Sequence, residues 1–440
     1  AQRTDALDMA DQLRAIAEQQ QGQAHYSPHE AHIDLSSVVG IVNNTIYCLP
    51  NMGRPQTALT LKDAVDMLTD ALGPDHPHTL TTRNNLATAH HAAGHLSTAI
   101  DMHQDLLADR TRVLGPEHPD TLVTRSNLAI TYQRVGNVRK ALDMHQAVLV
   151  DRTRVLGPDH PDTLITRNNL ATAHQQAGHL STAIDMHQDL LSDRTRILGP
   201  DHPRTLITRN NLAIAYRESG NLQKAIDMFE DVLTDRTRIL GPDHPHTLTT
   251  RGHLAIAYRE SGNLQKAIDM FEDVLTDRTR ILGPDHPHTL ITRRDLAVAR
   301  LKTGNAPRAM DMLEALFPHM EQILGPDHPD TLTTRNNLAY THEEAGHLST
   351  AIAMYQALLT DCTRVLGPDH PYTLGTRINL AGAHYAAGDL QATIDTYEAL
   401  LPDLTRVFGP DHPYAHTTRN NLAAARKKAQ QASSPQADGE

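Results

Sequence analysis

The stretch "ITRNNLAIAYRESGNLQKAIDMFEDVLTDRTRIL" at residues 207–240 returns 42 residues later, at 249–282, almost unchanged. The later copy differs only in its first residue and in the pair "NN", which becomes "GH" at Gly252 and His253. The whole second part of the stretch, from "GNLQKAIDM" onward, is identical in both copies. This pattern indicates a structural unit repeated in tandem, in which one face is kept and another is free to change.

The phrase "LGPDHP" and its variants mark the period of the whole chain. Its glycine recurs at a fixed step of 42 residues from Gly73 to Gly409, without insertion or deletion. Eight full units therefore occupy residues 73–408. A fixed period of this length is typical of a solenoid, in which each unit buries its apolar face only against its neighbours.

Each unit is predicted to contain two helices, as residues 73–114 illustrate. "GPDHP" ends the preceding helix, Asp75 or His76 can cap the next one, and Pro77 stands in its first turn. Gly94 is a natural C-cap before a second helix, "LSTAIDMHQDLLADRTRVL". The apolar residues expected to point inward from this second helix are Leu96, Ala99, Ile100, Leu106, Leu107 and Val113. The sequence thus predicts an all-α fold of tandem helix-turn-helix repeats.

The two ends of the chain depart from the repeat, as the ends of solenoids do. Residues 34–72 read as a degenerate unit, and residues 1–33 as the helix of a partial repeat with a connector. Residues 409–428 are expected to form a C-terminal capping helix, with "RKK" as its polar end, and residues 429–440 a disordered tail.

The pattern "TRNNLAxAYxxxGxxxxAIxxxxxxL…LGPDHPxTL" resembles the tetratricopeptide repeat, in the 42-residue form of kinesin light chains and of bacterial, notably actinobacterial, multi-repeat proteins. The family's signature falls on Leu86-Ala87, on the aromatic position of His90, on Gly94 and on Ala99, whereas Arg83 replaces its usual Trp. The resemblance spans about residues 34–428. It implies a right-handed superhelical solenoid whose inner groove, lined by the first helices, binds peptides or proteins.

Composition and charge exclude several other classes of function. The net charge is −12, and no basic cluster occurs beyond Arg426-Lys427-Lys428, so we expect no nucleic-acid partner. No apolar run approaches the ~20 residues of a membrane span, so no membrane partner is expected. Cys48 and Cys362 have no metal-ligand spacing and fit a reducing, cytoplasmic setting.

No catalytic motif occurs, so the sequence predicts no enzyme and no cofactor. Most of the 29 histidines belong to the "DHP" turns or to helix ends. His91 and His95 are four residues apart, but Gly94 ends the helix between them, so we expect turn packing and no metal site.

The candidate binding residues lie on the first helices. The second Asn of the "NN" pair has an amide that can hydrogen-bond a peptide backbone as donor and acceptor. The alternative is that these Asn cap neighbouring helices or persist from duplication. At the copied pair, Gly252, His253, Arg294 and Asp295 are expected to set local selectivity, with His253 able to charge near pH 6.5. The expected peptide-binding amides are Asn85, Asn127, Asn169, Asn211, Asn337, Asn379 and Asn421.

A Thr-Arg pair occurs in every first helix, from Thr82-Arg83 to Thr418-Arg419. Its Arg could bind a ligand carboxylate, but an ion-pair ladder with Asp101 or Asp109 and their copies is the favoured interpretation.

Two functions follow from these observations. The first is a non-enzymatic scaffold that binds a protein or an extended peptide, as the sensor or partner-binding part of a larger bacterial signalling protein. The alternative is a self-assembly or spacer element that forms homo-oligomers through exposed helical ends.

Overall fold

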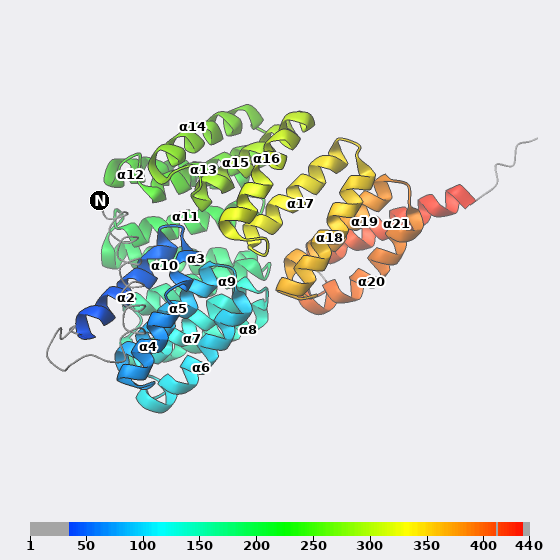
Figure 1. Cartoon of the computed structure of the whole chain (residues 1–440). Helices are drawn as coiled ribbons and strands as arrows, with labels where there is room; N and C mark the ends of the chain where they lie inside the picture. Colours follow the sequence, from blue (N-terminus) through cyan, green and yellow to red (C-terminus); the bar gives the residue numbers. More distant parts are fainter. Residues whose placement is uncertain (1–34, 411, 434–440) are drawn as a thin grey trace, which may run out of the picture. The chain divides into compact units, whose positions relative to one another are not determined.

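The computed structural model describes residues 35–410 and 412–433, and every regular element in these ranges is an α-helix (Figure 1). The described chain falls into two compact bodies. One contains residues 35–134 and 140–166, and the other contains residues 135–139, 167–410 and 412–433. Within each body, consecutive helices pack in antiparallel pairs that repeat with the period of the sequence.

The first helices of the units all begin at the proline of the "DHP" turn. They are α5 (Pro77–Ala92), α7 (Pro119–Arg134), α9 (Pro161–Gln176), α11 (Pro203–Glu218), α13 (Pro245–Glu260), α15 (Pro287–Lys302), α17 (Pro329–Glu344) and α19 (Pro371–Ala386).

The second helices end one residue before the glycine of the next turn. They are α6 (Leu96–Leu114), α8 (Val138–Leu156), α10 (Leu180–Leu198), α12 (Leu222–Leu240), α14 (Leu264–Leu282), α16 (Ala306–Leu324), α18 (Leu348–Leu366) and α20 (Leu390–Phe408).

The turn sequence sets these boundaries. Gly115 ends α6 with φ of 94°, a left-handed conformation that favours glycine. His76 caps α5, because its Nδ1 accepts a hydrogen bond from the His78 N–H at 3.2 Å. The same histidine bond recurs at the start of each first helix through α21 (Pro413–Ser433). The turn histidines therefore act as helix caps.

The core of each unit is a stripe along the second helix. In α6, Ala99, His103, Leu106 and Arg110 are buried, at the spacing of one helical face. Val113 was expected to point inward, and that prediction is wrong, because its side chain is 38% exposed. It continues the spacing of this stripe but lies in the last turn of α6, where its side chain is open to solvent.

The ends differ in detail from the predicted boundaries. The expected partial repeat at 1–33 lies outside the described residues. Residues 35–72 form α2 (Leu35–Asn51), α3 (Pro55–Leu59) and α4 (Lys62–Leu72), so the second helix of this unit is interrupted after Leu59. The last helix, α21, runs to Ser433 and thus five residues beyond 428.

Candidate functional site

In three units the predicted Asn lies where one first helix meets the preceding first helix. Asn127 donates from Nδ2 to the Asn84 side-chain oxygen at 3.2 Å. In the other body, Asn211 makes the same bond to Asn168 at 3.0 Å. Asn379 repeats it with Asn336, also at 3.0 Å. Within each body, these half-buried amides form a ladder along successive first helices.

The remaining amides of the predicted set occupy the same register with different surroundings. Asn85 donates to the Asn43 backbone carbonyl at 3.5 Å, which joins α5 to α2. Asn421 is exposed on α21 and donates to the Tyr397 hydroxyl at 3.3 Å. Asn169 and Asn337 lie half-buried on α9 and α17.

The copied pair at Gly252 and His253 alters this ladder. His253 replaces the second Asn, and its Nδ1 lies 3.2 Å from Nδ2 of Asn210, which is only 5% exposed. Its ring also lies beside Phe229, with centroids 5.9 Å apart. A Cβ at Gly252 would have only Arg278 Nη2 near it, at 3.9 Å, so this position leaves space along α13.

His253 does not behave as the sequence suggested. Burial lowers its pKa to about 3, and the positive charges of Arg217 and Arg278 act in the same direction. The prediction that this residue charges near pH 6.5 is therefore wrong. The physical reason is that His253 lies between units among buried arginines.

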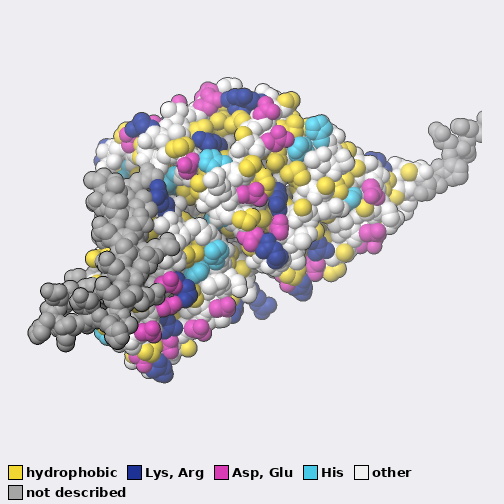
Figure 2. All heavy atoms as spheres, in the orientation of Figure 1, with side chains coloured by type: hydrophobic (Ala, Val, Ile, Leu, Met, Phe, Trp, Pro, Cys, Tyr) yellow, Lys and Arg dark blue, Asp and Glu magenta, His cyan; other side chains and the backbone are white. Residues whose placement is uncertain are grey.

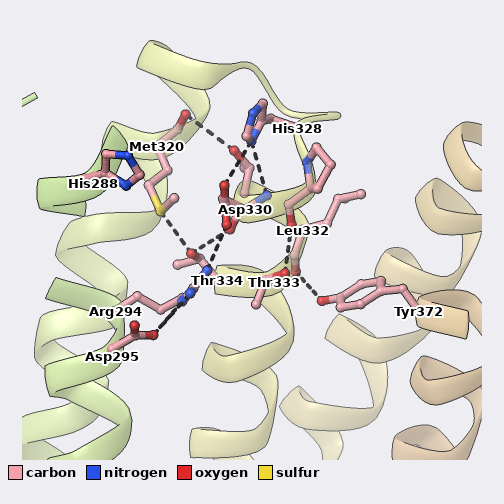
Figure 3. A network of polar contacts seen from close by, with 12 residues as sticks. His288, Arg294, Asp295, Met320, His328, Asp330, Leu332, Thr333, Thr334 and Tyr372 are labelled. Atoms are coloured by element: carbon pink, nitrogen blue, oxygen red, sulfur yellow. Dashed lines mark hydrogen bonds and ion pairs between the residues drawn. The ribbon is translucent and has the colours of Figure 1, made fainter. Parts of the chain in front are cut away.

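Arg294 and Asp295 form a charged cluster with the next unit (Figure 3). The Arg294 guanidinium contacts Asp295 Oδ1 at 3.1 Å and Asp330 Oδ1 at 3.2 Å. The side chains of Arg294 and Asp295 are only 13% and 16% exposed. Burial alone would lower the pKa of Arg294, but the two carboxylates hold it above its usual range. The pair thus ties α15 to the start of α17.

The arginine of the Thr-Arg pair is confirmed as part of an ion-pair ladder. Arg83 contacts Asp109 at 2.8 Å, and Asp109 also contacts Arg112, which reaches Asp75 in the turn. The partner of Arg83 is thus Asp109 and not Asp101. The copies of the Arg83–Asp109 pair are Arg125–Asp151, Arg167–Asp193, Arg209–Asp235, Arg251–Asp277, Arg335–Asp361 and Arg377–Asp403.

A second arginine series escaped the sequence interpretation. Arg110 is 3% exposed and donates from Nη1 to the Thr124 hydroxyl at 2.8 Å and to the Asp120 carbonyl. Burial lowers its pKa. Arg152, Arg194, Arg236 and Arg278 make the same two bonds to the next first helix. The sequence could have predicted this burial, because Arg110 continues the helical stripe of Ala99, His103 and Leu106.

Three buried histidines were missed as well. His103, His145 and His187 lie at the same position of α6, α8 and α10 and are almost fully enclosed. Both ring nitrogens of His145 and His187 lack a hydrogen-bond partner. Burial lowers the pKa of each of the three to about 4. They are therefore neutral at pH 7 and act as core residues.

The face in view in Figure 2 mixes acidic, basic and apolar side chains. Within residues 35–410 and 412–433, no group of three or more His, Cys, Asp or Glu side chains is arranged to hold a metal. In the same ranges, no helix has the length and apolar character of a membrane span.

Two family models, both described as tetratricopeptide repeat, match more than half of the chain. The first matches residues 131–194 and 182–237. The second matches 79–120, 247–288, 331–372 and 373–414. No curated relative matches the sequence.

Three solved structures are similar to this chain. A Rap protein complexed with competence and sporulation factor is 10% identical, with a TM-score of 0.53 over 90% of this chain and 99% of its own. The apo form of the quorum sensor NprR from B. thuringiensis is 13% identical, with a TM-score of 0.50 over 84% and 99%. At these identities the likeness shows the fold alone. Nearly identical TPR-like repeats of a kinesin-light-chain-type protein from Podosopora anserina are 26% identical, with a TM-score of 0.40 over 46% of this chain and 95% of their own.

Proposed function

Since this chain belongs to the tetratricopeptide repeat family, we propose that it is a non-enzymatic scaffold that binds an extended peptide along its first helices. The ligand is either a free peptide or a peptide segment of a partner protein. The chain would serve as the partner-binding part of a signalling protein.

The observation that carries this proposal is the amide ladder. Each bond of the type Asn211–Asn168 uses one N–H of an amide that also has a second N–H and a carbonyl oxygen. The bond fixes the orientation of the amide, so less side-chain entropy is lost when a ligand binds. Amides repeated at the interval of one unit suit a peptide backbone, whose donors and acceptors recur regardless of its side chains.

Selectivity in this proposal comes from the middle of the ladder. Gly252 leaves space for a ligand side chain on α13, and His253 presents a neutral imidazole. Arg294 pairs with both Asp295 and Asp330, so this cluster carries one net negative charge. A ligand without an acidic side chain at this point is therefore expected.

The Rap protein, which has a similar fold, was solved in complex with competence and sporulation factor, so this fold can hold a bound partner. Binding through many weak backbone contacts is a general property of extended ligands, and the ordering cost is then spread over several units.

A displayed random peptide library, selected on the full chain, provides the probe for the test. Affinity of a selected peptide is measured by calorimetry for the native chain and for N127A/N211A/N379A. The matched control is N221A/N263A, which removes two amides from the starts of α12 and α14 instead of the ladder. We expect the ladder variant to lose at least tenfold in affinity and the control to keep it.

A fold-preserving variant separates loss of binding from loss of structure. N211H copies the residue that the chain itself uses at His253, where the imidazole contacts the preceding Asn. If N211H has the same free energy of unfolding as the native chain but binds the peptide more weakly, the Asn211 amide contacts the ligand directly. Equal affinities for native, ladder and control variants would overturn the proposal.

A further inference from the structure

Three units close the turn between their two helices with a pair of facing imidazoles. One ring lies in the last turn of the first helix, and the other stands directly before the second helix. The pairs are His90 and His95, His174 and His179, and His342 and His347. The Nδ1 atoms lie 3.2 Å apart between His174 and His179 and 3.4 Å apart between His342 and His347. The ring planes meet at 45°, 45° and 43°.

The two positions change together along the chain. Wherever the first position is Tyr, the second is Asn, in the pairs Tyr132/Asn137, Tyr216/Asn221 and Tyr258/Asn263. A fourth histidine, His384, faces Asp389 with Nδ1 and Oδ2 3.6 Å apart. Imidazole and carboxylate are common ligands of divalent metals, whereas Tyr and Asn together are not. Asn also follows Arg, in the pair Arg300/Asn305. What holds in these units is that a His at the first position is always accompanied by an imidazole or a carboxylate at the second.

The geometry of the rings fits a bridging ion. Two imidazole nitrogens at about 2.0–2.1 Å from a tetrahedral zinc ion lie about 3.3–3.4 Å from each other. The observed Nδ1 separations of 3.2 and 3.4 Å match this spacing without movement of the backbone. In the absence of an ion, the same contact is a hydrogen bond from one ring to the other.

The surroundings of one pair also orient its imidazole. Glu314 Oε1 lies 3.8 Å from Nε2 of His342. A carboxylate on this side favours the Nε2–H tautomer, which leaves Nδ1 for the ion.

We propose that the His174–His179 and His342–His347 pairs are each a two-imidazole site for a divalent transition-metal ion such as Zn²⁺ or Ni²⁺, with water in the remaining positions. The His90–His95 pair is not included, because His90 Nδ1 has no hydrogen-bond partner. Because only two protein ligands take part, each site is open and weaker than a structural site with four. The ion joins the end of the first helix to the start of the second across the glycine turn. It therefore stabilises these two units and leaves the Tyr–Asn units unaffected.

The chain supplies its own control replacements for the test. In the variant H90Y/H95N/H174Y/H179N/H342Y/H347N, every His–His pair becomes the Tyr–Asn pair of neighbouring units, which keeps the fold. Calorimetric titration with ZnCl₂ and with NiCl₂ should show two equivalents fewer than in the native chain. A swap of the His174–His179 pair or of the His342–His347 pair alone should remove one. Circular dichroism without metal checks that the variants are folded.

The reverse change provides a gain of binding. Y216H/N221H should add one equivalent, because α11 and α12 present these positions in the same frame. The proposal is overturned if the native chain and the full swap bind equal numbers of ions with equal affinity, which would mean adventitious binding to other histidines. It is also overturned if the Y216H/N221H graft adds no site.

Discussion

The second helices of the early and later units share one backbone frame and differ in what they bury. At one position of the stripe, α6, α8 and α10 enclose His103, His145 and His187, whereas α12, α14, α18 and α20 enclose Phe229, Phe271, Tyr355 and Tyr397. The histidines are as buried as the aromatic rings, but their ring nitrogens include unpaired polar atoms. The comparison shows that the same backbone position accepts a buried polar or a buried apolar ring of similar size.

The interface between consecutive units, where a second helix meets the next first helix, shows the same contrast. Arg110 and its four copies donate to a Thr hydroxyl of the next unit, as Arg236 does to Thr250. Further along, Met320 takes this place, and the Thr334 hydroxyl donates to its sulfur at 2.9 Å (Figure 3). Opposite Leu404, the buried Thr418 hydroxyl has no partner. The arginine–threonine hydrogen bond is thus one of several contacts used at this interface, and its contribution to the free energy of unfolding can be measured.

The largest expected effect is a loss of folding stability at acidic pH. The folded pKa of His103, His145 and His187 is about 4, below the ordinary value of 6.5. Their neutral forms are favoured in the folded state, so stability is full above pH 6.5 and is lost as the pH falls toward 4. Each site contributes about 3 kcal/mol to this loss. Urea unfolding across this pH window measures it.

The control for the acid effect is H103F/H145F/H187F, which gives the early units the core of the later ones. Its stability should fall much less between pH 6.5 and 4 than that of the native chain. The remaining loss comes from other buried histidines, such as His91 and His253, whose pKa is lowered to about 4 and about 3. Carboxylates such as Asp235, whose pKa is held low by the hydrogen bond from Arg209, titrate below this window. An equally steep loss in the triple variant would contradict the assignment.

Shortening a buried arginine is the next largest change. R236A removes the bonds to Thr250 and to the His246 carbonyl and leaves a cavity, at a cost of about 2–4 kcal/mol. R236M copies Met320 and should change stability by less than ~1 kcal/mol. Chemical unfolding of both variants measures their free energies of unfolding. Similar losses of stability in R236A and R236M would show that the guanidinium is required.

A single aromatic replacement should stabilise the protein at neutral pH. H187F removes two unpaired ring nitrogens from a site with no solvent exposure and copies Phe229. We expect a gain of about 1–3 kcal/mol at pH 7. Thermal unfolding of H187F beside the native chain measures it, and a lower melting temperature would show that the early units cannot accommodate the phenyl ring.

The smallest effect is expected at the partly exposed ion pairs. D235N weakens the contact with Arg209, and the cost should not exceed ~1 kcal/mol. The loss should shrink in high salt, since the Asp235 carboxylate is partly exposed to solvent. A salt-independent loss well above this value would indicate that the ladder is a cooperative network.

Local sequence rules predicted much of the fold. The period of 42 residues, the Pro and Gly of the turns and the helix-capping role of His76 follow from residues close together in the chain. The Arg83–Asp109 ladder was also predictable, because both residues belong to one unit. These features depend on helical spacing and turn chemistry, which the sequence states directly.

Contacts between units could not be predicted in this way. His253 meets Asn210 across 43 residues, and its burial among arginines depends on how neighbouring first helices are aligned. The sequence "DRTR" contains two arginines, of which Arg110 is buried and Arg112 exposed. The helical stripe distinguishes them, but the threonine that accepts from Arg110 belongs to the next unit.

The most direct test of the central claim compares two scans of one selected peptide. If ladder amides such as Asn127 and Asn211 hold a peptide backbone, N-methylation of successive backbone nitrogens should weaken calorimetric affinity at least tenfold at several positions. Alanine replacement of the same residues should have small effects, except for the residue that lies opposite Gly252. The opposite pattern, with tolerance to N-methylation and strong loss on alanine replacement throughout, would contradict backbone recognition by the ladder.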